Sequence, residues 1–219
     1  MKRYLAILLS LLLICGLAFA EEAEDPDAIT SATLHMERLP EVKAEDNGII
    51  VIYFSPDDTT RAAAYAVAAG LNAALFEIVP AEPYTEDDLN YFDSFARSIK
   101  ESKDPLARPA IAALPENLEQ YDTVLLGYPV WGGKAPKIML TFLESVDLSG
   151  KTIVPFCTSN SSPFGTSDGD MKLLTDGSVT WRKGTRINKG STAEEIIEKA
   201  PRLIEPGRFF TGLTSPARP

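Results

Sequence analysis

Hydroxyl side chains follow two strongly apolar runs of the sequence, and an indole follows a third. Ser55, Thr59 and Thr60 come after one run, and the segment 158–167 after another is rich in serine and threonine. Between them, 129–136 carries a tryptophan followed by two glycines. Hydroxyls and backbone N–H groups at a helix start bind phosphate, and an exposed aromatic contacts a flat ring. These segments predict a site for a ligand with a phosphate at one end and an aromatic ring at the other.

The first of these segments also has a plainer interpretation. The run 49–54 is apolar and mostly β-branched or aromatic, as in a strand buried on both faces. The alanine-rich run 62–69 favours a helix. In an ordinary strand-to-helix turn, Thr59 or Thr60 would simply cap that helix. The residues alone leave both interpretations open.

Hydrolytic and metal chemistry are disfavoured. The only histidine, His35, precedes the apolar pattern, so a hydrolase using Ser55 or Ser159 would lack a nearby histidine base. The same shortage argues against a zinc site built from His and Cys. Asp87 and Asp88 are adjacent carboxylates, but paired acids in a first helical turn usually cap the helix. We therefore predict no catalytic residue and no metal ligand.

Three other residues have a structural and a functional interpretation. Cys157 would be redox-active if it were exposed, but a lone cysteine after a strand is more often buried and inert. Trp181 and Arg182 would contact a ligand if they faced the site, but a tryptophan in a strand more often belongs to the core. We assign neither a catalytic nor a binding role to these three residues.

The first twenty residues have the pattern of a secretory signal peptide. Two basic residues precede an apolar stretch that ends at the small-x-small site Ala18-Phe19-Ala20. The stretch is shorter than the ~20 residues that a membrane-spanning helix needs. Cys15 follows the bulky Ile14, where lipoprotein signals usually carry a small residue. We predict cleavage near Ala20 and an unlipidated soluble product that is extracellular, periplasmic or in the cell envelope, without stable membrane insertion.

The rest of the chain divides into an acidic tether at 21–47, one domain at 48–200 and a tail at 201–219. Removal of the signal peptide would change the formal net charge from −10 to −12, because two basic residues are lost. An acidic surface argues against nucleic acid and anionic membranes as partners, and it suits a basic redox partner. Cys157 is the only cysteine after the predicted cleavage site, so no intrachain disulfide is expected.

Strands and helices alternate along the predicted domain. The predicted strands are 49–54, 74–79, 122–128, 152–157 and 179–187. Helices are predicted between and after them, at 62–69, from Thr85, at 138–146, at 171–174 and from the cap Thr192 to Ala200. This alternation predicts an α/β domain in which a parallel sheet is covered on both faces. Ligands of such sheets bind outside the carboxyl ends of the strands, where the three loops described above would lie.

Several stretches resemble the flavodoxins. Tyr53-Phe54-Ser55 and then Thr60 resemble their phosphate loop, usually Ser-x-Thr-Gly-x-Thr, and 126–133 is similar to their second flavin loop. The segments 148–153 and 156–159 resemble the lead-in to the third loop. The segments 84–89 and 108–109 resemble those of a bacterial flavodoxin-like branch that is often exported. The resemblance covers about 48–200.

The resemblance implies a flavodoxin-like three-layer sandwich with a five-stranded parallel sheet in the order 2-1-3-4-5. It implies bound FMN and either electron transfer as a carrier or reduction of a quinone-type acceptor, with a redox protein as a second partner class. It does not decide whether the protein is an enzyme. Carried over by position, the phosphate would be bound by Ser55, Thr59 and Thr60. The flavin ring would be bordered by Pro129, Val130, Trp131, Gly132, Thr158, Ser159, Asn160 and Gly165.

Asp57 and Asp58 stand where the family pattern has threonine and glycine. A carboxylate at ~4 Å from a phosphate repels it by roughly 1–4 kcal/mol for each pair of unit charges. Carboxylates are also favourable at a helix N-terminus, so these two are expected to fill the anion site themselves. Arg61 and Lys134 are candidates to offset the repulsion. We therefore predict weak FMN binding with little discrimination against riboflavin, and the alternative is a flavodoxin fold that has lost FMN and serves as a binding or structural module.

Overall fold

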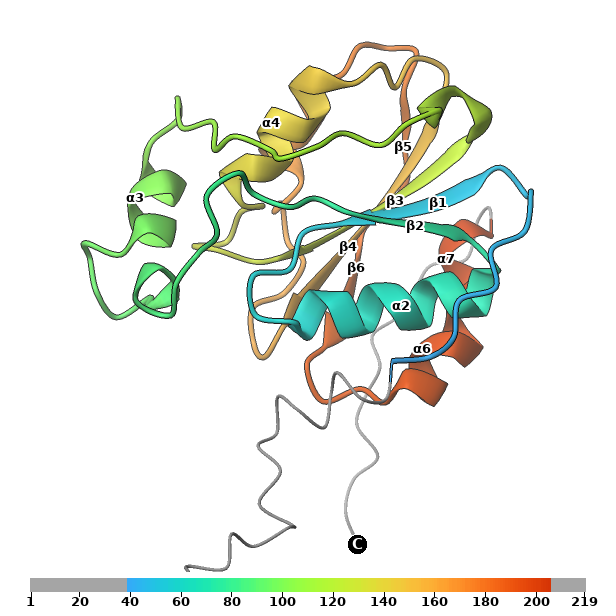
Figure 1. Cartoon of the computed structure of the whole chain (residues 1–219), viewed down its shortest axis with the longest axis horizontal. Helices are drawn as coiled ribbons and strands as arrows, with labels where there is room; N and C mark the ends of the chain where they lie inside the picture. Colours follow the sequence, from blue (N-terminus) through green and yellow to red (C-terminus); the bar gives the residue numbers. More distant parts are fainter. Residues whose placement is uncertain (1–38, 206–219) are drawn as a thin grey trace, which may run out of the picture. The chain divides into compact units, whose positions relative to one another are not determined.

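The computed structural model describes residues 39–205, in which a parallel sheet lies between helices (Figure 1). Its strands follow the order β2-β1-β3-β4-β5, and β6 also pairs with β4. Their bounds are β1 (Ile49–Tyr53), β2 (Ala74–Glu77), β3 (Thr123–Pro129), β4 (Thr152–Ser159), β5 (Thr180–Trp181) and β6 (Thr185–Asn188). All of these pairings are parallel. The predicted fold class and the strand order 2-1-3-4-5 are confirmed.

The central strand β1 is buried because both of its faces are apolar. Ile50 and Ile52 pack in the cluster that includes the apolar face of α4 (Lys137–Ser145). Val51 packs on the opposite side, with the alanines of α2 (Thr59–Leu71). The alternation of side chains along a strand sends successive residues to opposite faces, so one apolar run serves both cores.

The helix α6 (Ala193–Lys199) lies beside α2 on the same face of the sheet (Figure 1). Gly70 makes this close approach feasible, because a Cβ there would lie 2.6 Å from the carbonyl oxygen of Ile197. The side chain of Thr192 accepts a hydrogen bond from the Glu195 N–H, so Thr192 caps α6 as its sequence position predicts.

The fifth sheet position contains two short strands instead of the continuous strand predicted at 179–187. β5 pairs with β4 at residues 152–153, and β6 pairs with β4 at 156–159. Three residues, 182–184, therefore stand opposite Val154 and Pro155. Since proline has no N–H to donate to the ladder, the extra residue is accommodated there and pairing resumes afterwards.

The segment between β2 and β3 carries little regular structure. It contains the 3₁₀ turns η1 (Asp87–Leu89) and η2 (Leu118–Gln120) and the helix α3 (Arg97–Lys103). α3 lies near the carboxyl ends of the central strands (Figure 1). The helix predicted from Thr85 is only the turn η1: Thr85 and Asp88 exchange capping bonds, but the backbone becomes extended at Asn90, with φ −70° and ψ 95°.

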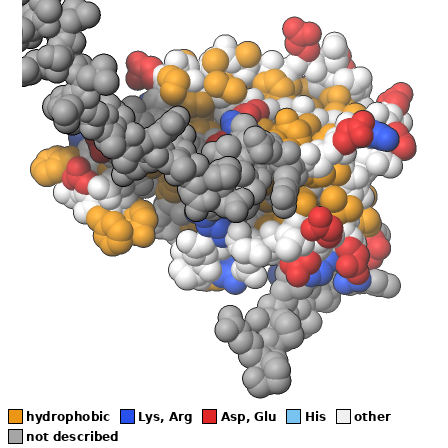
Figure 2. Space-filling model, turned by 60° about the horizontal axis from the view of Figure 1, so that its bottom comes forward, with side chains coloured by type: hydrophobic (Ala, Val, Ile, Leu, Met, Phe, Trp, Pro, Cys, Tyr) orange, Lys and Arg blue, Asp and Glu red, His pale blue; other side chains and the backbone are white. Residues whose placement is uncertain are grey.

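Two short helices, α5 (Gly169–Lys172) and α7 (Pro201–Ile204), complete the described part. Within residues 39–205, no helix is long and apolar enough to cross a membrane. On the face that Figure 2 turns forward, Lys and Arg side chains are scattered among acidic ones without forming a continuous basic patch. The predicted signal peptide, the cleavage site and most of the tether and tail lie outside the described residues.

Candidate functional site

The loop between β1 and α2 keeps the backbone that a glycine would favour, although its residue is an aspartate. Asp58 has φ 60° and ψ −11° and is the residue that precedes the first turn of α2. It occupies the glycine position of the family pattern. Aspartate is one of the few residues that tolerate this left-handed region. Thr59 and Thr60 are the first helical residues, so neither is the N-cap.

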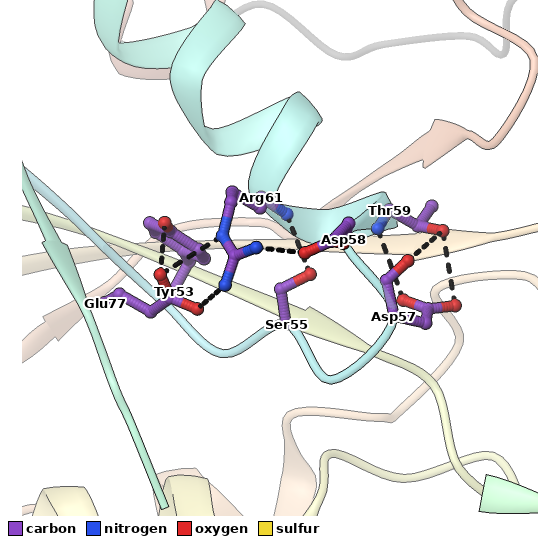
Figure 3. Close-up of polar contacts among 7 residues, drawn as sticks. All are labelled: Tyr53, Ser55, Asp57, Asp58, Thr59, Arg61 and Glu77. Atoms are coloured by element: carbon purple, nitrogen blue, oxygen red, sulfur yellow. Dashed lines mark hydrogen bonds and ion pairs between the residues drawn. The ribbon is translucent and has the colours of Figure 1, made fainter. Parts of the chain in front are cut away.

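Arg61 lies between two carboxylates, those of Asp58 and Glu77, and binds both (Figure 3). Its guanidinium donates to both oxygens of Glu77, at 2.5 Å and 3.2 Å, and it also pairs with Asp58. The Tyr53 hydroxyl donates to Glu77 at 2.9 Å. These contacts, led by the bond to Glu77, raise the pKa of Arg61, and burial raises the pKa of Tyr53. The positive charge nearest the loop is therefore committed to two carboxylates of the same chain.

Asp57 folds over the start of α2 (Figure 3). Its carboxylate accepts from the Thr59 N–H at 3.3 Å and from the Thr59 hydroxyl at 3.2 Å. Lys189, which follows β6, lies 3.9 Å from the same carboxylate. The Thr59 N–H also donates to the Asp57 backbone carbonyl at 2.8 Å. Asp57 thus engages the N–H and hydroxyl donors of Thr59, which a phosphate would need. Of the two aspartates, Asp57 bonds to the start of α2, whereas the Asp58 carboxylate pairs with Arg61 and makes no capping bond.

The two remaining hydroxyls of this loop are buried and bonded within the protein. Ser55 is 7% exposed, and its oxygen accepts from the Arg61 N–H at 2.9 Å. Thr60 is fully buried, and its hydroxyl lies 2.7 Å from that of Thr158 at the end of β4. Ser55 and Thr60 therefore hold the loop to α2 and to the next part of the site.

The second loop presents an aromatic cluster. Trp131 and Lys134 exchange backbone hydrogen bonds across Gly132 and Gly133, whose φ values are 58° and 82°. Two successive positive φ values are those of a type I′ turn, which glycine readily adopts. This tight turn holds the half-buried Trp131, while its glycine tip is exposed. Pro129, the last residue of β3, and Val130 lead into the turn and are half-buried.

Trp131 packs with two aromatics from other parts of the chain. Its ring centroid is 5.8 Å from Phe54 at the end of β1 and 5.4 Å from Tyr84, with edge-to-face geometry in both pairs. The Arg97 guanidinium lies 4.2 Å from the Tyr84 ring, whose hydroxyl donates to Glu101 at 2.5 Å. Phe54 and Tyr84 were not among the predicted site residues. Phe54 ends an apolar strand, and only the folded chain brings Tyr84 to it.

The third loop begins where β4 ends. Thr158 is buried, Ser159 is half-buried, and Asn160 and Gly165 are exposed, with Gly165 at φ 55°. The parallel sheet thus brings the starts of all three predicted loops to the carboxyl ends of β1, β3 and β4. Direct contacts between these segments include the Thr60–Thr158 bond, the Phe54–Trp131 pair and a hydrogen bond of 2.9 Å from the Ala135 N–H to the Ser167 carbonyl.

The other candidate residues have structural contacts. Burial raises the pKa of the Cys157 thiol to about 12, which agrees with an inert cysteine. The Trp181 indole donates to the Thr175 hydroxyl, and its ring packs against the core. Lys134 pairs with Asp170 at 2.9 Å instead of with the first loop. Residues 39–205 contain no group of three His, Cys, Asp or Glu side chains placed to hold a metal.

Comparisons with known proteins identify the class to which this fold and these loops belong. Residues 48–201 match the family model described as flavodoxin. The chain is 38% identical to a Bacteroides eggerthii protein whose name places it among the flavoproteins, with a TM-score of 0.64 over 71% of this chain and 96% of the other. A similarly named protein from Bacteroides uniformis is 37% identical, with the same TM-score over 68% and 95%. The chain belongs to the flavodoxin family.

A more distant structure shares the fold. It is a flavoprotein from Lactobacillus acidophilus in complex with FMN, 20% identical, with a TM-score of 0.53 over 70% of this chain and 97% of the other. No curated protein gives a significant match.

The two ends of the candidate site differ in how they fit FMN. The second loop offers the half-buried Trp131 beside the exposed backbone of Gly132 and Gly133, which suits a flavin ring. The first loop fits a dianionic phosphate poorly, because Asp57 holds the donors of Thr59 and Arg61 is bound to Glu77 and Asp58. The residues present therefore suit the ring of FMN and disagree with its phosphate.

Proposed function

We propose that this protein binds a flavin at the carboxyl edge of its sheet and passes electrons, as a carrier or as a simple flavin-dependent reductase. The supporting observation is the aromatic cluster around Trp131 at this edge, in a member of the flavodoxin family. A flavin supplies the redox chemistry when bound, and the protein supplies its binding and electrostatics. FMN is the flavin that the family resemblance implies. A redox protein or a quinone-type molecule would be the acceptor.

The chain's own residues would position the ring and exclude water from one side of it. Trp131 is held by Phe54 and Tyr84 and by the glycine turn, so its indole needs little reordering to meet a ligand. Burial and the Glu101 hydrogen bond raise the pKa of Tyr84, so its hydroxyl remains a donor to Glu101 even in alkaline solution. We assign Tyr84 a positioning role through Trp131.

A flavin titration tests this function. We expect the visible absorption of added FMN or riboflavin to shift on binding, and dithionite followed by air to bleach and restore it while the flavin stays bound. Unshifted spectra and quantitative recovery of both flavins in the late, protein-free fractions of a desalting column would contradict flavin binding. That result would favour the second candidate, a fold that has lost its cofactor and acts as a binding or structural module. Asp57 over the start of α2 is the observation in its favour.

We further propose that the protein is exported and that its mature form begins at Glu21. The basis is the signal-peptide pattern of residues 1–20, with a small-x-small site at 18–20 and a bulky residue before Cys15. Mass spectrometry of the N-terminal peptide from cells that express the full chain is expected to give an unmodified Glu21. A lipidated Cys15, or retention of residues 1–20, would overturn the proposal.

A further inference from the structure

A pocket lined by both polar and apolar residues adjoins the first loop on the α2 and α6 face of the sheet. It has a volume of about 460 Å³, and Thr59, Thr158, Asn188 and Lys189 are among the residues that line it. Thr59 begins α2, Thr158 lies near the end of β4, and Asn188 ends β6. The pocket therefore starts at the phosphate loop and continues past the ends of two neighbouring strands.

Two acceptors lie in or beside the pocket. The side-chain oxygen of Asn188 is buried and has no hydrogen-bond partner within the part of the chain that the structure describes. A buried acceptor without a partner is unfavourable, so it favours a ligand that brings a donor. The Asp57 carboxylate, 3.9 Å from the lining residue Lys189, is a second acceptor and carries a negative charge. Both groups suit a hydroxyl, which can donate, and neither suits a phosphate dianion.

The nearby cations do not reverse this preference. Arg61 is engaged by Glu77 and Asp58, and Lys189 lies 3.9 Å from Asp57. A phosphate monoester would have to compete with these carboxylates for the cations and with Asp57 for the donors of Thr59. A terminal hydroxyl would leave the ion pairs in place and would donate to an oxygen that is already there.

From this arrangement we infer that the chain selects a flavin whose ribityl chain ends in a free hydroxyl, as in riboflavin, over one that ends in a phosphate. The inference rests on the flavin binding proposed above. In this inference, the pocket and Asp57 contact the end of the ribityl chain. Asp57 thus becomes a specificity-determining residue that excludes FMN.

Isothermal titration of the full chain with riboflavin and with FMN, at low and at high salt, tests this selectivity. We expect riboflavin to bind several-fold more tightly than FMN at low salt, and the gap to narrow at high salt as the charge repulsion is screened. Asp57→Asn should bring the two dissociation constants closer together, because it should lower that of FMN. Asp147→Asn is the matched control, because it removes the same charge at an exposed turn before β4, at the opposite edge of the sheet, and should leave the ratio unchanged.

Asn188→Leu provides an independent test of the pocket. Removal of the buried oxygen should weaken the binding of riboflavin. Circular dichroism checks that the variant is folded. An FMN dissociation constant equal to or below that of riboflavin overturns the inference and leaves flavin binding intact. The inference is also overturned if the ratio of the two dissociation constants changes equally in the Asp57 and Asp147 variants. If neither flavin binds the unmodified chain, the proposed flavin function itself fails.

Discussion

The two ends of the candidate site use different forces. At the first loop, charged and polar groups of the chain bind one another, as in the chain Asp58–Arg61–Glu77–Tyr53 (Figure 3). At the second loop, Trp131, Phe54 and Tyr84 meet edge to face, and an exposed glycine turn lies beside them. The first end is closed by electrostatic contacts within the protein. The second is built mainly from aromatic packing, and its charged neighbours Arg97 and Glu101 contact the cluster through Tyr84.

This difference indicates that the two ends can change independently. Aromatic packing depends on shape and buried area, so it is insensitive to charge at the first loop. Phosphate binding depends on donors and on net charge, which two aspartates alter without disturbing the backbone, since Asp58 retains the left-handed conformation. A family member can therefore keep its ring contacts while its preference at the phosphate end is lost.

The largest effect is expected from Arg61→Gln, which removes the cation of the first loop. Glu77 and Asp58 would lose their shared partner while partly buried, at 26% and 40% side-chain exposure. Loss of one member of such a network should lower the free energy of unfolding by about 2–3 kcal/mol. Chemical denaturation measures this change.

The matched control for Arg61 is Arg108→Gln. Arg108 pairs with Glu144 at 2.7 Å, and this pair is more exposed, at 31% and 39%. Loss of this pair should lower the free energy of unfolding by about 0–1 kcal/mol, as is typical of surface ion pairs. Equal losses for the two variants would mean that the first loop is no more tightly organised than the rest of the surface.

The second loop is tested by Trp131→Ala. We expect flavin binding to weaken by roughly 1–3 kcal/mol, the range for stacking of a base on an aromatic side chain. Trp131→Phe keeps an aromatic face and should recover most of the affinity. Fluorescence titration of riboflavin gives both values. Unchanged affinity of the alanine variant would remove Trp131 from the site.

Elements were easier to predict from the sequence than contacts between loops. The four main strands and α2, α4 and α6 follow from apolar runs and caps, because those patterns are local. The split at Pro155 required the register of β4 against β5 and β6. Proline alone does not show which strand faces it.

The site shows the same division. Ser55, Thr59, Thr60 and Trp131 were predicted from loop composition, and Asp57 from a departure within the family pattern. The Arg61–Glu77 pair was not predicted, because it depends on β2 lying next to β1. The same is true of Tyr84, whose ring partners are distant in sequence, and of Asn188, which is placed by the pairing of β6 with β4. The spacing of Asp58 and Arg61, three residues apart at a helix start, was the one local signal of this network.

Replacement of both aspartates should allow the first loop to accept a phosphate. The double variant Asp57→Thr with Asp58→Gly restores the family pattern. It also removes the carboxylate that accepts from the Thr59 hydroxyl. FMN affinity should rise by about tenfold, equivalent to ~1.4 kcal/mol, while riboflavin affinity changes little. The gain should shrink as salt rises if the loop is exposed. Calorimetry with both flavins measures it, and a similar gain for riboflavin would refute a charge-based account.

The connection between the first loop and the end of β4 is tested at the hydrogen bond between the hydroxyls of Thr60 and Thr158. Both side chains are buried, so Thr60→Val leaves the Thr158 hydroxyl without this partner and should cost about 1–2 kcal/mol of unfolding free energy. Thr158→Val should behave alike. The double valine variant removes both polar groups in nearly the same shape, so its loss should be smaller than the sum of the two single losses. Denaturation of the four proteins gives the coupling. Additive losses would mean that the two hydroxyls act separately and that the first loop and β4 are joined by packing alone.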